Sequence, residues 1–210
     1  FKSDLHAPSI LTNNNIICLT DDADRNIWLG TLEGLNVYNK ETGVIRKCSY
    51  PGIDNNQILC LLVTRDNTLW LGNRFGLFRY NRDTDTMIPY SGSTSNHIIP
   101  GSAITYLYED SDGDLWIGTR SEGLYRHDIK NNRFYSYPVM NSRNSVHIIF
   151  EDSRKQIWFI GWDEGLFLLK NPKDMERVSW INYRHHTDDE YSLQDNMAYD
   201  LYEDIHTQSL

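Results

Sequence analysis

The chain has 210 residues, of which 40% are hydrophobic and 23% are charged, as in ordinary soluble globular proteins. Its formal net charge of −9, with no run rich in Lys or Arg, argues against nucleic-acid binding, which needs clustered positive charge. No apolar run approaches the roughly 20 residues that cross a bilayer, and the polar start of the chain shows no signal peptide.

Four similar blocks follow one another along the chain. They contain Trp28, Trp70, Trp116 and Trp158, which are 42, 46 and 42 residues apart. An alternating apolar run precedes each Trp, at residues 16–21, 58–63, 104–109 and 146–151. A further run of this kind begins a fifth block at residues 197–210 and ends before a Trp is reached. A period of this size indicates a repeat array.

Each block is predicted to form four short β-strands. The alternating run is the first strand, and a turn with signals such as Asp112-Gly113 leads to the second strand, which carries the Trp. A turn closed by a Gly with positive φ follows, and the third and weaker fourth strands complete the unit. The closing glycines are Gly34, Gly76, Gly123 and Gly165.

Four antiparallel strands in every ~40–45 residues indicate an all-β fold, a β-propeller built of four-stranded blades. The Trp of each second strand should fill the wedge between neighbouring sheets, and the Gly beside it should let backbones approach. We expect the first strands to be the most buried, together with Cys18 and Cys60. Cys18, Cys48 and Cys60 show no CxxC spacing and are predicted to be free, buried thiols.

The recurring phrase around each Trp, as in "EDSDGDLWIGTRSEGLYRHD" at residues 109–128, resembles the two-component regulator propeller repeat. The phrase "RHHTDDEYSLQDNMAYDLYED" at residues 184–204 is similar to the connection between blades in that family. The resemblance implies the periplasmic sensor region of a hybrid two-component histidine kinase from Bacteroidetes, anchored in the inner membrane by a helix elsewhere in the parent. It also implies seven-bladed propellers, a β-sandwich, and regulation of transcription in response to oligosaccharides from glycan breakdown.

The chain departs from the repeated pattern in a few places. The second block has Val63-Thr64 where an acidic pair is usual and Asn73 where Thr31 and Thr119 stand. The fourth block has an extra residue, Ile160, before Gly161, and then Trp162 in place of Thr. Repeated positions serve the scaffold, so a binding site should lie where the repeat is broken.

Metal binding and catalysis are not expected, and no cofactor is implied. Asp22, Asp24 and Asn26 imitate part of a calcium loop but lack its central Gly, and the adjacent His185 and His186 cannot easily share a metal ion. The acidic turns are therefore predicted to be solvated hairpin turns. No hydrolase or nucleotide-binding motif is present. Propeller lyases share the expected fold, but fold alone does not carry their chemistry.

Ligand binding is the favoured function, on the loops that join strands two and three of each blade. Arg74, Phe75, Arg120, Trp162 and Asp163 break the repeat there: aromatic rings can stack on a sugar, and the charged groups can bind hydroxyl, uronate or sulfate groups. The competing interpretations are that Trp162 packs against a neighbouring blade and that both arginines are solvated loop charges. Lower-ranked candidates on the inter-blade loops are Asn96, His97, Arg143 and Asn144.

The sequence therefore predicts one partial propeller over residues 1–210, with four blades and a fragment at each end. Residues 1–11 are interpreted as the tail of an earlier blade. The expected function is non-catalytic sensing of oligosaccharides; a protein-binding scaffold and a lyase or glycan hydrolase are the alternatives. The open ends should be covered by the other propeller and β-sandwich parts of the parent or by self-association.

Overall fold

The computed structural model describes residues 11–90, 102–137, 145–204 and 206. Over these residues every regular element is a β-strand, and the strands form four antiparallel sheets of four strands each. The first two sheets contain β1 (Ile16–Asp21), β2 (Asn26–Thr31), β3 (Gly34–Asn39), β4 (Ile45–Cys48), β5 (Ile58–Val63), β6 (Leu69–Asn73), β7 (Gly76–Asn81) and β8 (Thr86–Pro89). The other two contain β9 (Ile104–Glu109), β10 (Leu115–Thr119), β11 (Leu124–Asp128), β12 (Arg133–Tyr137), β13 (Val146–Glu151), β14 (Ile157–Gly161), β15 (Gly165–Lys170) and β16 (Ser179–Tyr183).

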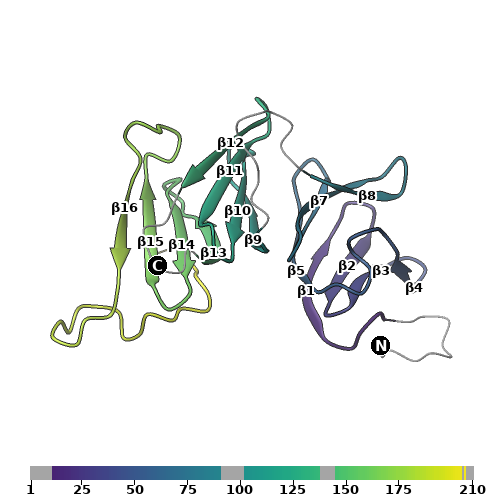
Figure 1. Ribbon diagram of the computed structural model, residues 1–210, viewed down its shortest axis with the longest axis horizontal. Helices are drawn as coiled ribbons and strands as arrows, with labels where there is room; N and C mark the ends of the chain where they lie inside the picture. The colour runs from purple at the N-terminus through teal and green to yellow at the C-terminus, as the bar shows by residue number, and fades with distance from the viewer. Residues whose placement is uncertain (1–10, 91–101, 138–144, 205, 207–210) are drawn as a thin grey trace.

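The sheets are the blades of an open propeller. Within each sheet every strand pairs with the strand that follows it in the chain. The first strands β1, β5, β9 and β13 contact one another from blade to blade. Figure 1 shows blades one and two on the right and blades three and four on the left, in an arc that does not close. The predicted all-β propeller fragment is confirmed.

The repeated Trp of each second strand is buried in every blade, as predicted for a structural residue. In blades one, three and four the indole Nε1 donates to an Asp carboxylate six residues earlier. These pairs are Trp28–Asp22 at 2.8 Å, Trp116–Asp110 at 2.9 Å and Trp158–Asp152 at 2.9 Å. The other oxygen of each Asp accepts two backbone N–H groups of the hairpin turn. The acidic turn is thus a structural device that holds the Trp and closes the hairpin.

Blade two lacks this device because Thr64 occupies the Asp position. Its hydroxyl lies 2.6 Å from Asp66 Oδ1, and the buried Trp70 Nε1 has no hydrogen-bond partner among the described residues. The departure from the repeat at Val63-Thr64 therefore leaves one unsatisfied donor in the core.

The Gly after each of the first three tryptophans lets the next blade approach. A Cβ built on Gly30 would lie 2.9 Å from Cβ of Ile58 on β5, and one on Gly72 would lie 2.8 Å from Cβ of Ile104 on β9. One on Gly118 would lie 3.0 Å from Cγ1 of Val146 on β13. This predicted role of the small residues is confirmed at all three junctions between complete blades.

The expectation that the first strands are the most buried is wrong. All side chains of β6, β10 and β14 are buried, whereas β1 is largely exposed and β5, β9 and β13 are mixed. A second strand has sheet neighbours on both sides as well as adjacent blades on its faces, whereas a first strand lies at the inner edge of its sheet. For the same reason Cys60 is buried but Cys18, on β1, is only partly buried.

The predicted glycine-closed turns and free thiols are present. The four closing glycines, Gly34, Gly76, Gly123 and Gly165, have φ values of 128°, 132°, 84° and 82°. At Gly165 a Cβ would also collide with the carbonyl oxygen of Tyr183. All three cysteines are free, and burial raises the pKa of Cys18 and of Cys48 to about 12.

Blade four has no extra residue at Ile160, which corrects the prediction from the sequence. In the strand pairing Ile148 lies opposite Ile160, just as Cys18 lies opposite Gly30 in blade one. Ile160 therefore occupies the position of the Gly after Trp, and it is buried. The run at residues 198–204 aligns with 104–110, so the residue that would approach this position from the next repeat is Ala198. At this junction the bulky side chain, Ile160, therefore belongs to the preceding blade. At the earlier junctions the preceding blade has Gly, and the bulky side chain comes from the following blade.

Each blade is tied to the hairpin turn of the blade before it by a carboxylate at the end of its first strand. Glu109 accepts the N–H of Arg65 at 2.8 Å, Glu151 that of Ser111 at 2.6 Å, and Glu203 that of Ser153 at 2.8 Å. Where Val63 replaces the acid, the Asn67 amide oxygen accepts the N–H of Ala23 at 2.9 Å instead.

The fifth run makes this same tie without forming a described strand. Over residues 197–204 only Asp204 forms an isolated bridge, yet Glu203 is buried and its second oxygen accepts the Ser153 hydroxyl at 2.7 Å. This segment therefore lies against blade four where the next first strand is expected.

Candidate functional site

The five predicted binding residues lie on the loops between the second and third strands, and the structure brings some of them together. Arg120 and Trp162 line one groove, while Asp163 lies on the far side of Trp162. Arg74 and Phe75 do not line this groove; the Arg74 guanidinium covers the exposed Phe75 ring at 4.5 Å. Asn96, His97, Arg143 and Asn144 lie outside the described residues.

The groove lies at the junction of blades three and four and has a volume of about 400 Å³. Its lining consists of Arg120, Ser145, His147 and Trp162. Arg120 and Trp162 hold the same repeat position, directly after the second strands β10 and β14, so the ring geometry sets them side by side. His147 comes from β13, whose inner edge faces the axis. The volume falls within the range of small-molecule sites in proteins.

His147 links the members of this groove. Its ring packs against Trp162 with centroids 4.8 Å apart and an interplanar angle of 50°, and its Nε2 lies 3.0 Å from the Ser145 hydroxyl. Burial lowers the pKa of His147, and the positive charge of Arg120 lowers it further. His147 is therefore mostly neutral at pH 7, and the cation among the described lining residues is Arg120.

Trp162 is 44% exposed. Its ring forms a wall between the groove and a second hollow. That hollow, of about 180 Å³, is lined by Asp163 and Ile160 of blade four and by Met197, Ala198 and Tyr199 of the fifth run. His147 and Trp162 line both spaces. A ligand at this position would meet an aromatic face with a cation on one side and a carboxylate on the other.

His147, Ser145 and Tyr199 are not among the residues that the sequence pattern predicts. His147 is the residue that bulges out of the pairing between β13 and β14, and Ile17, Leu59 and Thr105 take the same position in the first three blades. Aligning this position would have shown an imidazole where the other blades have aliphatic or hydroxyl side chains. Tyr199 occupies it in the fifth run and is well exposed.

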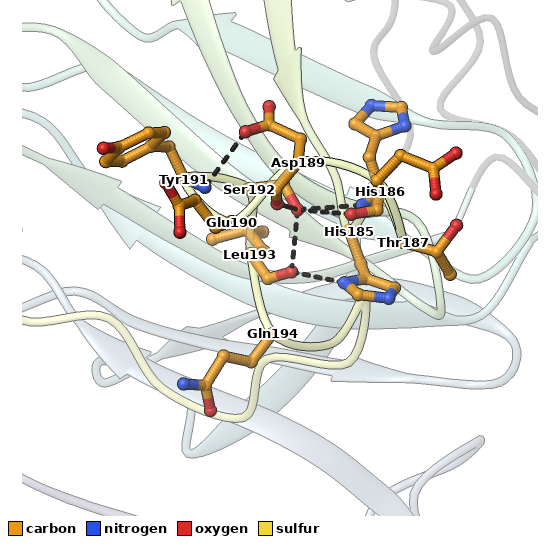
Figure 2. A pocket seen from close by; sticks show the side chains of 10 residues that line it. His185, His186, Thr187, Asp189, Glu190, Tyr191, Ser192, Leu193 and Gln194 are labelled. Carbon is orange, nitrogen blue, oxygen red and sulfur yellow. Dashed lines mark hydrogen bonds between the residues drawn. The ribbon is translucent and has the colours of Figure 1, made fainter.

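A hollow of about 640 Å³ is formed by a single loop after β16 (Figure 2). The loop is closed by its own hydrogen bonds: His185 Nδ1 lies 2.6 Å from the Leu193 carbonyl oxygen, and Ser192 Oγ accepts the N–H of His186 at 2.9 Å. Figure 2 shows the rings of His185 and His186 pointing in different directions. Every lining residue belongs to residues 185–194, so this hollow joins no two elements of the fold.

Within the described ranges, no group of three or more His, Cys, Asp or Glu side chains has the arrangement of a metal site. The acidic turns are occupied by their own N–H groups, and Lys173 Nζ lies 3.6 Å and 3.5 Å from Asp110 and Asp114 and also pairs with Asp112. The same described residues form no helix that is long and apolar enough to cross a membrane.

Comparison with known proteins relates the chain to a repeat family and to a fold. Residues 10–33, 52–75 and 98–121 match the model described as two component regulator propeller. Histidine kinase P4 of Formosa agariphila is 27% identical over 81 residues, which are 34% of this chain and 6% of that protein.

Two solved structures illustrate the fold. The extracellular domain of BT4673 from B. thetaiotaomicron, described as a hybrid two component system, has a TM-score of 0.71 and 22% identity, over 87% of this chain and 24% of that one. Virginiamycin B lyase from Staphylococcus aureus has a TM-score of 0.62 and 17% identity, over 80% of this chain and 55% of that one.

At such identities the structural likeness shows the fold alone. The chain spans about a quarter of the BT4673 domain and 6% of the kinase, so it corresponds to a part of these larger proteins. The likeness to the family rests instead on the three matched segments, which contain the first strands and the tryptophans of successive blades. In these segments the chain matches the two component regulator propeller repeat.

Proposed function

We propose that this chain is a non-catalytic, ligand-binding part of the extracytoplasmic sensor of a hybrid two-component histidine kinase, and that it recognises oligosaccharides. The observation that carries this proposal is the half-exposed Trp162 at the groove between blades three and four, beside His147 and Arg120. An indole face presents apolar area to the C–H groups of a sugar ring, and the polar groups around it can bind hydroxyls.

The family match and the fold support the sensor assignment, and the extracellular domain of BT4673 supports a periplasmic location. In such a sensor the ligand acts by population shift. It favours one arrangement of the propeller relative to the rest of the parent, and the kinase responds in proportion to the difference in affinity between the two arrangements.

A thermal-shift screen of the chain against defined oligosaccharides tests the proposal. A ligand at 100 times its dissociation constant should stabilise the native state by ~2.7 kcal/mol. Trp162→Ala should abolish the shift. Phe75→Ala, which removes an exposed aromatic ring from the corresponding loop of blade two, is the matched control and should leave the shift intact.

The outcome also separates the alternative functions. Appearance of shortened or unsaturated products on incubation with the same glycans would indicate a hydrolase or lyase and would contradict the non-catalytic assignment. A protein-binding scaffold is favoured by one specific observation, the exposed Ile16, Ile17 and Leu19 on β1, and would show no oligosaccharide-dependent shift.

A further inference from the structure

The charge distribution around the groove narrows the class of ligand. Among the described residues, its lining contains one cation, Arg120, one imidazole, one hydroxyl and one indole, and no carboxylate. Arg120 makes no ion pair with any described residue, although the chain carries a formal net charge of −9. An unpaired guanidinium beside an aromatic face is suited to a ligand that brings its own anion.

We infer that the groove binds an acidic sugar, with the ring stacked on Trp162 and its carboxylate or sulfate group paired with Arg120. This inference rests on the proposed function and specifies its ligand class. The anionic group of a uronic acid or of a 6-sulfated sugar projects from the edge of the pyranose ring. A ring lying flat on the indole can therefore direct that group sideways to the neighbouring repeat position, where Arg120 lies.

The neighbouring side chains fit this orientation. With Nε2 of His147 engaged by Ser145, its other ring nitrogen has no hydrogen bond among the described residues and remains for a ligand oxygen. On the opposite side of Trp162, Asp163 lies in the smaller hollow with Tyr199. A second acidic group would be repelled there, whereas hydroxyl groups can donate to the carboxylate. The site therefore favours an acidic residue on the blade-three side and a neutral residue on the Asp163 side.

Two matched panels of oligosaccharides test the inference on the whole chain. The acidic panel consists of oligogalacturonates, alginate oligosaccharides and carrageenan oligosaccharides, which separate carboxylate from sulfate. The neutral panel consists of cello-, xylo- and galacto-oligosaccharides of the same lengths. Binding is followed by calorimetry and by the change in tryptophan fluorescence that is lost in Trp162→Phe.

We expect binding from the acidic panel, with affinity reduced at least tenfold in Arg120→Met. Arg74→Met removes an exposed arginine from the same repeat position of blade two and should leave the affinity unchanged. A loss of equal size in both variants would indicate non-specific attraction and would overturn the assignment to this groove.

The remaining outcomes distinguish the two proposals. Binding of a neutral oligosaccharide that needs Trp162 but is unchanged in Arg120→Met overturns the acidic ligand and leaves the sensory site standing. If no member of either panel alters fluorescence or thermal stability, both the acidic ligand and the proposed sugar-binding function are wrong.

Discussion

Trp70 shows what a single departure from the repeat does to a buried residue. Its indole N–H is buried without a partner because Thr64 stands where Asp22, Asp110 and Asp152 accept the same group in the other blades. A buried donor without an acceptor costs about 1–3 kcal/mol of folding free energy.

Replacing Thr64 with Asp should therefore increase the free energy of unfolding by about 1 kcal/mol, because the new carboxylate can accept from Trp70 and from the turn. The reverse change, Asp152→Thr, should decrease it by about 1–3 kcal/mol. Urea denaturation of both variants measures the two effects. Destabilisation by Thr64→Asp would show that the turn of blade two cannot adopt the geometry of the others.

The two kinds of Trp should respond differently to truncation. Trp116→Ala removes a fully buried side chain and should cost ~3–5 kcal/mol, whereas the half-exposed Trp162→Ala should change stability far less. Thermal unfolding of the two variants compares them directly. Equal destabilisation would mean that Trp162 is a structural residue, which would remove the main support for the binding groove.

His127 should make stability depend on pH. It is buried, stacked on Phe134 at 4.1 Å, and its Nδ1 has no described partner; burial lowers its pKa below the ordinary value of 6.5. A depressed folded-state pKa means that the unfolded chain binds the proton first. Stability is then full above pH 6.5 and falls as the pH decreases from 6.5 to the lower folded value.

The comparison with His127→Leu, which copies Leu169 at the same position of blade four, isolates this effect from other titrating groups. Lowering the pH from 7.5 to 5 should decrease the unfolding free energy of the wild type more than that of the variant. A pH-independent difference would contradict the assignment of His127.

At the scale of the strand, the sequence predicts where each first strand begins and ends but not how deeply it is buried. The bounds predicted for the four first strands match β1, β5, β9 and β13 residue for residue, because alternation and hairpin turns are local signals. Relative burial was predicted wrongly because it depends on neighbouring blades. Ile160 was misplaced because the Gly was aligned by residue type, whereas the strand pairing aligns it by hydrogen bonds.

The sequence likewise predicts some residues of the groove but not how they come together. Arg120 and Trp162 break the repeat in the sequence, so they could be selected. Their convergence on His147 depends on the bulge in β13 and on the junction of two blades, which no local pattern reports.

The Gly that admits the next blade provides a test at this scale. Gly72→Ala would place a Cβ 2.5 Å from Cys60 Sγ and 2.7 Å from Ile104 Cγ2, so overpacking should cost about 1–3 kcal/mol. Gly161→Ala would meet its nearest atom, Glu164 Cβ, at 3.1 Å in a loop and should cost less. Chemical denaturation of the pair measures the difference. Equal costs would show that Gly72 is not required for blade packing.

At the scale of the whole molecule, no other described residue covers the outer face of β1. Leu19 on β1 is 65% exposed, whereas Leu107 and Ile149, at the same position in β9 and β13, are 5% and 1% exposed because a preceding blade covers them. We expect the isolated chain to self-associate through this face. Light scattering over a range of concentrations should show a rise in mass, and Leu19→Glu should suppress it. A monomer at all concentrations would contradict the expectation.

The ties between blades also bear on how such a chain can be rearranged by duplication and deletion. Each tie joins a carboxylate only to the turn just before it, so gaining or losing one whole unit would leave all distant contacts unchanged. Two junctions would not survive such an exchange. The first blade relies on Asn67 in place of an acid, and Ile160 requires a small neighbour such as Ala198. A second blade moved elsewhere would bring no carboxylate, and a fourth blade set before β5 would drive Ile160 into Ile58. The residues that the repeats share are compatible with any order of the blades. The order is therefore specified by the residues that depart from the repeat.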